Sequence, residues 1–193
     1  MKKKIAIFIS GRGSNMKAIV EQCNKGILED LADVQLVFAN KEAAAGLDYA
    51  KSMGIKTNWI SSKGLKRSVF DQKVLDYLNG FDLDYIILAG YMRVLSSDFV
   101  KAYTGRIINI HPADTRKHQG LNAYDWAFNN KMTETKITIH YVDEGMDTGA
   151  VIAQHIVDLN GVNSIDEVEK RGLKVEHEFY SKVIRELILN ETS

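Results

Sequence analysis

The stretch KIAIFISGRGSN, residues 4–15, places a short apolar run directly before a glycine-rich turn. Residues 16–22 continue as an amphipathic segment, so the expected order is strand, turn and helix. Free backbone N–H groups and the positive end of the helix dipole point to one spot in such a turn, which suits it to bind a phosphate. The stretch therefore predicts the first strand of an α/β sheet, with an anion site after it.

Two common phosphate-binding patterns do not fit this turn. The dinucleotide fingerprint G-x-G-x-x-G needs a third glycine where Met16 stands, and the second expected strand ends in Asn40 instead of an acidic, ribose-binding residue. A Walker loop would close with Gly-Lys-Ser or Gly-Lys-Thr, which does not follow here. NAD is therefore a poor fit. A simpler alternative is that Gly11 and Gly13 only allow a tight turn, while Ser14 caps the helix.

The rest of the chain alternates between short β-branched runs and amphipathic stretches. Near-continuous apolar strands separated by helices are typical of a parallel sheet covered on both faces. We therefore expect a doubly wound, mostly parallel α/β sheet of the Rossmann-like type. The expected strands are residues 4–10, 34–40, 57–60, 84–90, 106–110, 136–142 and 151–157, and the expected helices are residues 16–22, 43–53, 69–78, 98–103 and 123–128.

A long final helix is expected after Ser164-Ile-Asp-Glu167, which has the pattern of a capping box. Its apolar residues recur at spacings of three and four, so one face should pack on the sheet. That face comprises Ile165, Val168, Gly172, Val175, Phe179, Val183 and Leu187.

The composition is that of a soluble globular protein, and we expect residues 1–193 to form a single domain. Apolar residues make up 45% of the chain, and 25 basic residues balance 25 acidic ones. A net charge of zero provides no overall field toward nucleic acid or an anionic membrane, so neither is expected as a partner. The single Cys23 excludes an intramolecular disulfide and a multi-cysteine zinc site, and we expect a buried, inert thiol.

The N-terminal residues 1–10 resemble a signal peptide only in part. Their apolar run is shorter than the roughly 7–15 residues of a signal-peptide core, and no window approaches the ~18 apolar residues of a membrane span. We therefore expect a cytoplasmic protein, as a monomer or a homodimer.

The run INIHP, residues 108–112, contains the only proline of the chain, directly after a histidine. Asn109 and His111 alternate at the carboxyl end of an expected strand, so both side chains can project from one face at the edge where α/β sheets bind ligands. Proline holds the residue before it in an extended conformation. A fixed acid or donor beside an amide can stabilise the oxyanion formed when a carbonyl is attacked. Taken singly, Asn109 also fits a strand end and His111 a satisfied, half-buried histidine.

The loop DEGMDTG, residues 143–149, supplies three candidate carboxylate partners for the imidazole, namely Asp143, Glu144 and Asp147. Which of them contacts His111 stays open at this point, and Asp147 also fits a simple turn former.

Other chemistries fit less well. The chain has no G-x-S-x-G elbow and no H-E-x-x-H pattern, and its remaining histidines do not cluster at metal-ligand spacing. His118 and His155 are expected to be structural or exposed. The basic cluster of residues 63–67 lacks interleaved aromatics, which favours a solvated helix face over a nucleic-acid patch.

Five segments together resemble the phosphoribosylglycinamide formyltransferases of purine synthesis. They are GRGSN (11–15), ANKEAAAGLDYA (39–50), DYIILAGYMRVLS (84–96), FVKAYTGRIINIHP (99–112) and DEGMDTGAVI (143–152). An N-x-H-P run with an Asp 36 positions after the His is typical of folate-dependent formyltransferases. Methionyl-tRNA formyltransferases carry an added C-terminal domain, and formyltetrahydrofolate hydrolases carry an added N-terminal one. We expect this protein to be neither enzyme, because the matching segments span most of its 193 residues.

The resemblance implies transfer of a formyl group from 10-formyltetrahydrofolate to the primary amine of glycinamide ribonucleotide, without a metal. Asn109 would bind the developing oxyanion, His111 would donate to it, and Asp147 would orient His111 and assist proton movement.

The resemblance also implies the binding residues, divided between a phosphate-binding half of about residues 1–100 and a folate and catalytic half of about residues 101–193. Glu176 would hold the substrate amine, with an exposed helix carboxylate as the simpler alternative. The phosphate would lie on Gly13, Ser14 and Asn15, and the folate on Leu88, Met92, Arg93, Val94, Val142 and Asp143.

One loop departs from the family pattern. Family members follow His-Pro with Ser-Leu-Leu-Pro and then Tyr-Pro-Gly, whereas residues 113–120 read ADTRKHQG, with Lys117 and Gly120 matching. The loop is more polar and lacks two prolines that would fix φ. The runner-up function is therefore transfer to another amine, such as an amino sugar on a nucleotide. A non-catalytic folate- or nucleotide-binding module is a separate alternative.

Overall fold

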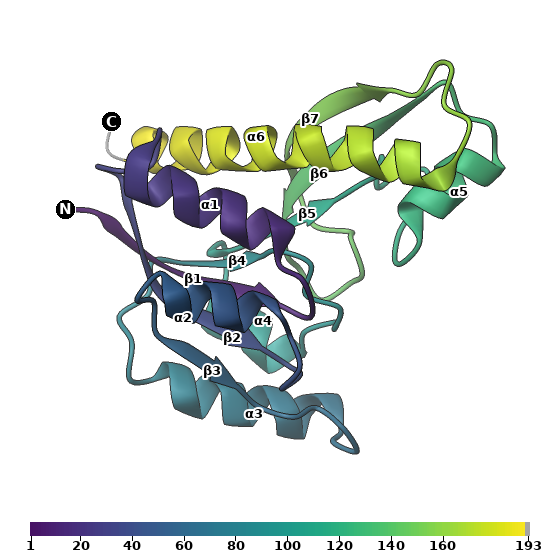
Figure 1. Cartoon of the computed structure of the whole chain (residues 1–193). Coiled ribbons are helices and arrows are strands. Elements are labelled where there is room, and N and C mark those ends of the chain that lie inside the picture. Colours follow the sequence, from purple (N-terminus) through teal and green to yellow (C-terminus); the bar gives the residue numbers. More distant parts are fainter. Residues whose placement is uncertain (192–193) are drawn as a thin grey trace.

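A computed structural model describes residues 1–191 and shows seven strands and six helices (Figure 1). The strands are β1 Lys3–Ile9, β2 Ala32–Ala39, β3 Thr57–Trp59, β4 Tyr85–Leu88, β5 Ile107–His111, β6 Glu134–Tyr141 and β7 Val151–Asp158. The helices are α1 Ser14–Lys25, α2 Gly46–Ser52, α3 Arg67–Leu78, α4 Ser97–Ala102, α5 Ala123–Asn129 and α6 Ile165–Glu191. Every element expected from the sequence is present, with ends displaced by a few residues.

All seven strands form one sheet with the order β3-β2-β1-β4-β5-β6-β7. β1 pairs in parallel with β2 on one side and with β4 on the other, so the strand order reverses between β1 and β4. β5 is parallel to β4, whereas β6 is antiparallel to both of its neighbours. The prediction of a doubly wound, mostly parallel sheet is confirmed. The carboxyl ends of β1, β4 and β5 share the edge where such sheets bind ligands.

Helices cover both faces of the sheet (Figure 1). Successive residues of β1 point to opposite faces, so Ile5, Ile7 and Ile9 pack with α1, α2 and α6, whereas Ala6 and Phe8 pack with α3 and α4. All five side chains are fully buried, and burial of each larger one contributes about 1.5–3 kcal/mol. Two-sided burial explains why the parallel strands are continuous apolar runs.

Ser164 and Glu167 cap the start of α6 as predicted, but one of their two hydrogen bonds goes to a different backbone N–H. Ser164 Oγ accepts the backbone N–H of Glu167 at 3.2 Å, as in a capping box. The Glu167 carboxylate accepts the backbone N–H of Asn163 at 2.6 Å, one residue before the N–H that the pattern predicts. The chain entering α6 is thus fixed from both sides of the cap.

The packed stripe of α6 is rotated from the predicted apolar face. Ile165, Val175, Phe179 and Leu187 are only half-buried. Residues four apart form the centre of the packed stripe, namely Val168, Gly172, Glu176, Tyr180, Ile184 and Ile188. Because Glu176 belongs to this stripe, α6 carries a carboxylate into the interior.

The single cysteine lies in the core. Cys23, on α1, is 8% exposed. Burial raises the pKa of its thiol to about 12, so the thiol stays protonated at neutral pH. The predicted buried thiol is confirmed.

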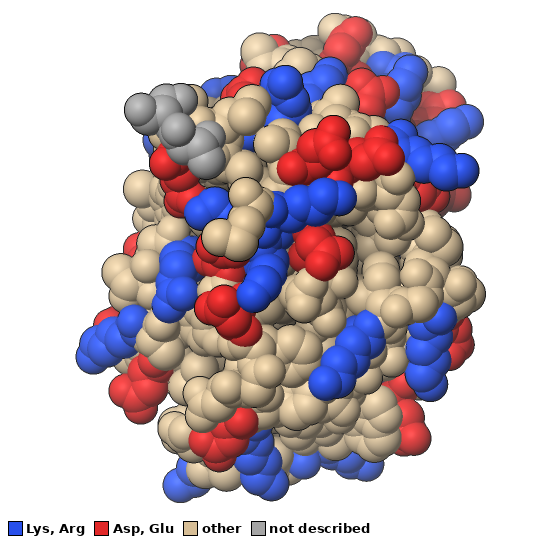
Figure 2. Space-filling view, turned by 90° about the vertical axis from the view of Figure 1, so that its left-hand side faces the viewer, with Lys and Arg blue, Asp and Glu red and all other residues tan. Residues whose placement is uncertain are grey.

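Positive and negative side chains are interspersed on the face shown in Figure 2. Lys3 lies 3.4 Å from Asp84 and 3.0 Å from Glu191, and Lys4 lies 3.1 Å from Asp82. Charge around the first residues of β1 is therefore balanced locally. Within residues 1–191, no helix is both long and apolar enough to cross a membrane.

Candidate active site

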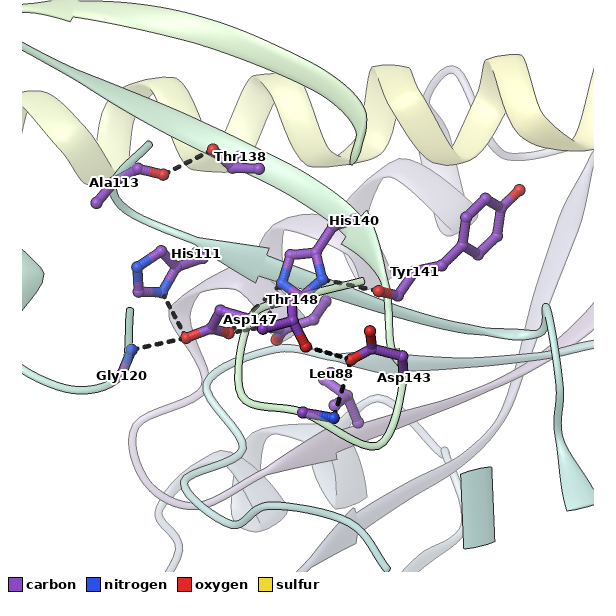
Figure 3. A network of polar contacts seen from close by, with 12 residues as sticks. Leu88, His111, Ala113, Gly120, Thr138, His140, Tyr141, Asp143, Asp147 and Thr148 are labelled. Carbon is purple, nitrogen blue, oxygen red and sulfur yellow. Dashed lines mark hydrogen bonds and ion pairs between the residues drawn. The ribbon is translucent and has the colours of Figure 1, made fainter. Parts of the chain in front are cut away.

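The three predicted catalytic residues meet at the carboxyl edge of the sheet. Asn109 and His111 belong to β5, and Asp147 comes from the loop between β6 and β7. Figure 3 shows His111 and Asp147 pointing toward one another. Asn109 Nδ2 lies 3.2 Å from Asp147 Oδ1, and His111 Nδ1 lies 3.4 Å from Asp147 Oδ2. Alternation along β5 thus places both side chains against one carboxylate.

Of the three carboxylates in residues 143–149, Asp147 is the one that reaches His111. The carboxylate of Asp143 accepts two hydrogen bonds within its own loop, at 3.0 and 2.7 Å. The carboxylate of Glu144 accepts a hydrogen bond from the first residue of α4 at 2.7 Å. These contacts decide which of the three carboxylates is the partner of His111, a choice that the sequence left open.

The backbone fixes one proton of His111. Its Nε2 lies 3.1 Å from the carbonyl oxygen of His118, which can only accept, so Nε2 carries a proton. In the neutral ring, Nδ1 then presents a lone pair to Asp147. Burial lowers the pKa of His111, and the attraction of the Asp147 carboxylate opposes this shift only in part. His111 is therefore neutral at pH 7 and becomes a donor at Nδ1 when it takes up a second proton.

Asp147 is held in its ionised form. Burial opposes the charge, but the backbone N–H of Gly120 donates to the carboxylate at 2.8 Å, and the pKa of Asp147 lies below its usual value. Its φ of 55° lies in the left-handed region, which is typical of turn-forming residues. Asp147 thus shapes its loop and also presents a fixed negative charge to His111.

His140 is a site residue that the sequence analysis missed. The antiparallel register of β5 and β6 places it directly opposite Asn109, and Figure 3 shows it beside Asp147. Its Nδ1 lies 2.8 Å from the Tyr141 carbonyl oxygen, so the neutral ring carries its proton there. Nε2 then accepts from Asn109 Nδ2 at 3.1 Å. His140 thereby orients the Asn109 amide, and only the register between two strands could have revealed it.

The predicted phosphate-binding turn leads directly into α1. Gly13 takes the N-cap position with a φ of 69°, and Ser14 is the first helical residue, so the alternative in which Ser14 caps the helix is wrong. The buried amide of Asn15 donates to Glu176, while its Oδ1 has no hydrogen-bond partner within residues 1–191. The first N–H groups of a helix lack intrahelical partners, so the turn retains donors for an anion.

Glu176 is 5% exposed, so the alternative of an exposed helix carboxylate is wrong. Its two oxygens accept hydrogen bonds from Asn15 Nδ2 and from the hydroxyl of Tyr124 on α5. Tyr124 comes this close because Gly172 has no side chain: a Cβ there would lie 2.1 Å from the Tyr124 hydroxyl oxygen. Glu176 is therefore fixed beside the start of α1 by residues from three helices.

A cavity of about 660 Å³ opens beside Asn109, His111 and Asp147. Its size lies within the range of roughly 300–1,000 Å³ that is usual for small-molecule pockets. One side chain beside it is held by another element: the Arg93 guanidinium lies 4.5 Å from the centre of the Phe70 ring on α3. The cavity is lined by all six residues expected to bind folate, namely Leu88, Met92, Arg93, Val94, Val142 and Asp143.

The arrangement is suited to acyl transfer. The two protons of Asn109 Nδ2 lie toward His140 Nε2 and Asp147 Oδ1, so Asn109 donates to an oxyanion when that oxygen replaces Asp147 on one of them. The protonated form of His111 is a second donor, and Asp147 stabilises the imidazolium. Within residues 1–191, no group of three or more His, Cys, Asp and Glu side chains is placed to hold a metal ion.

Comparisons with known proteins agree with this chemistry. The family model described as formyl transferase matches residues 3–184. The phosphoribosylglycinamide formyltransferase of Bacillus subtilis (strain 168) is 35% identical over 96% of this chain and 95% of its own length. That of Haemophilus influenzae is 37% identical over 95% of this chain and 86% of its own length.

A solved structure shares the fold over the same extent. Glycinamide ribonucleotide transformylase 1 from Geobacillus kaustophilus has a TM-score of 0.91 and 38% identity, covering 97% of this chain and all of its own. The family model, the relatives and the shared fold all span nearly the whole chain, which therefore belongs to the formyl transferase family.

Proposed function

We propose that the protein transfers the formyl group of 10-formyltetrahydrofolate to the primary amine of glycinamide ribonucleotide. The observation that carries this proposal is the mutual contact of Asn109, His111 and Asp147 beside a cavity of ligand size. The names of the relatives in Bacillus subtilis and Haemophilus influenzae support the acceptor.

In the proposed reaction, the amine nitrogen attacks the formyl carbon and the carbonyl electron pair moves onto the oxygen. Asn109 Nδ2 donates to this oxygen, and the negative charge beside His111 favours uptake of a proton at Nδ1, which then donates as well. The bond between the formyl carbon and N10 of the folate then breaks. The proton that His111 Nδ1 takes up is the one that the amine loses, and the His111–Asp147 pair returns it to N10 as that bond breaks.

The acceptor is proposed to lie between the turn at Gly13, Ser14 and Asn15 and the carboxylate of Glu176. Backbone N–H groups of the turn bind the ribonucleotide phosphate, and Glu176 accepts hydrogen bonds from the amine. Holding both ends of one molecule fixes the amine for attack, which is worth several orders of magnitude in rate.

The folate is proposed to bind in the 660 Å³ cavity. Backbone groups of Met92, Arg93 and Val94 bind the polar edge of the pterin, and Asp143 fixes the loop on the other side of the cavity through its two hydrogen bonds. Leu88 and Val142 supply apolar walls, as is usual for a pocket that fixes its ligand with few polar groups.

A spectrophotometric formyl-transfer assay with 10-formyltetrahydrofolate tests the proposal, run with glycinamide ribonucleotide and without an acceptor. Turnover that requires the ribonucleotide is the expected result. Folate binding with no ribonucleotide-dependent turnover would contradict the proposed acceptor.

Transfer to another amine is a second candidate because residues 113–119 carry polar side chains where the family has apolar ones and prolines. The same assay with a nucleotide-linked amino sugar distinguishes the two candidates. Turnover with neither acceptor, together with tight folate binding, would identify a non-catalytic binding module.

A further inference from the structure

The loop of residues 113–119 is built around a buried carboxylate. Asp114 is 5% exposed, and its backbone carbonyl accepts the N–H groups of Lys117 and His118 at 2.8 and 3.0 Å. These two bonds close a tight turn. The polar loop is therefore ordered by its own backbone at the point where proline is absent.

The side chain of Asp114 ties this turn to the sheet. Lys136 Nζ on β6 lies 3.0 Å from its carboxylate, and Gln154 Nε2 on β7 lies 3.4 Å away. Arg116, from the loop itself, contacts both carboxylate oxygens at 3.2 and 3.1 Å. The Arg116 guanidinium and the Lys136 ammonium hold the pKa of Asp114 well below its usual range, although burial opposes ionisation. The anchoring carboxylate is therefore charged at neutral pH.

A second contact runs beside the first. Thr138 Oγ1 on β6 donates to the carbonyl oxygen of Ala113 at 2.6 Å (Figure 3). Gln154 Nε2 donates to the Thr138 hydroxyl oxygen at 2.9 Å. A side chain from β6 and one from β7 thus contact the first two residues of the loop, Ala113 and Asp114.

The far end of the loop contacts the reacting groups. The His118 carbonyl accepts the Nε2 proton of His111 at 3.1 Å, and the Gly120 N–H donates to Asp147 at 2.8 Å. The His118 ring stacks between His111 and Trp126, with centroid distances of 6.2 and 4.9 Å. The position of the loop therefore sets both the proton on His111 and the orientation of its ring.

We propose that Asp114 is a positioning residue for His111, which acts by anchoring residues 113–120 to β6 and β7 through Lys136 and Gln154. The ion pair takes over the constraint that prolines give to the corresponding loop in the family. The rate measurement that tests this proposal rests on the formyl transfer proposed above. The second measurement, the pKa of His111, does not depend on that function.

Asp114→Asn and Lys136→Met are expected to lower kcat about 10- to 100-fold, the usual effect of misplacing a reacting group by about 1 Å, while the KM for folate stays near that of the parent protein. Arg116→Met is the matched control, because it removes one cation from the same carboxylate without cutting the tie to the sheet. Its kcat is expected to match that of the parent. Thermal melting of each variant establishes whether it is folded. If Asp114→Asn is not folded, the comparison of Lys136→Met with Arg116→Met tests the proposal.

The pKa of His111, followed by NMR in the ligand-free protein, separates anchoring from simple electrostatics. The titratable groups facing His111 are Asp147, His140 and His118. Removing the cation of Lys136 would by charge alone raise the pKa of His111, whereas losing the His118 carbonyl from Nε2 lowers it. We expect the pKa to fall in both Asp114→Asn and Lys136→Met and to stay unchanged in Arg116→Met.

A pKa of His111 that rises in Lys136→Met, or a kcat that falls equally in Lys136→Met and Arg116→Met, would overturn the proposal. Because the titration needs no substrate, a protein that lacks formyl transfer would still report whether the loop is anchored in this way.

Discussion

Asn109 and His140 are direct partners in the antiparallel pairing of β5 and β6, with 3.1 Å between Nδ2 and Nε2. The Tyr141 carbonyl holds the proton of the neutral His140 ring on Nδ1, so Nε2 is an acceptor. The Asn109 amide consequently has one favoured orientation, in which its nitrogen faces the site. Asp147 Oδ1, which also accepts from Nδ2 at 3.2 Å, favours the same orientation of the amide.

Asn109→Ala is expected to lower kcat by about 10² to 10³, the usual cost of losing one oxyanion donor, with a smaller change in KM. Steady-state kinetics measures this split. Asn24→Ala, on the exposed side of α1, is the control and should leave kcat unchanged. A kcat for Asn109→Ala equal to that of the control would remove Asn109 from the reaction.

His140→Leu is expected to lower kcat roughly tenfold, because one hydrogen bond worth about 1–1.5 kcal/mol no longer orients Asn109. His140→Gln retains an acceptor and should recover part of the loss. His155→Leu, an exposed position on β7, provides the control. If His140→Leu and Asn109→Ala have additive effects in the double variant, the two residues do not act through one another.

Asp147→Asn is expected to lower the pKa of His111 further below 6.5, because the carboxylate is the main group that opposes the effect of burial. An NMR titration of the His111 ring measures the shift. Asp143→Asn, whose carboxylate bonds within its own loop, is the control. An unchanged His111 pKa in Asp147→Asn would show that the two groups are not coupled.

The pKa of His111 also predicts how stability depends on pH. A group whose pKa is lower in the folded than in the unfolded state binds fewer protons when folded, so it contributes stability that is complete above about pH 6.5 and is lost as pH falls toward the folded pKa. Urea unfolding of His111→Leu between pH 7 and pH 5 should therefore show a smaller loss of stability than the parent protein. A larger loss would mean that the sign is reversed.

Gly172→Ala is expected to displace Tyr124 from Glu176, because the new Cβ would lie 2.1 Å from the Tyr124 hydroxyl oxygen. Overpacking of this kind costs about 1–3 kcal/mol of unfolding free energy, even though alanine is the better helix former. The KM for the amine acceptor should rise while that for folate does not. Gly80→Ala, whose Cβ would meet its nearest neighbour at 3.7 Å, is the control.

Much of the fold follows from local patterns along the chain. The apolar run before Gly11 and the run that ends at His111 predict parallel strands, because strands buried on both faces are continuous apolar runs. The alternation of Asn109 and His111 correctly places both on one face. These features depend on residues that are near one another in sequence, so they can be read without the tertiary structure.

The sequence by itself determined the strand and helix order, the glycine turn at the start of α1 and the pairing of Asn109 with His111. The tertiary structure decided the partners that come from distant elements: Asp147 in place of Glu144, His140 opposite Asn109, Tyr124 on Glu176, and Lys136 on Asp114. Strand register and helix rotation set these contacts, and both are fixed by packing of the whole core rather than by any local pattern.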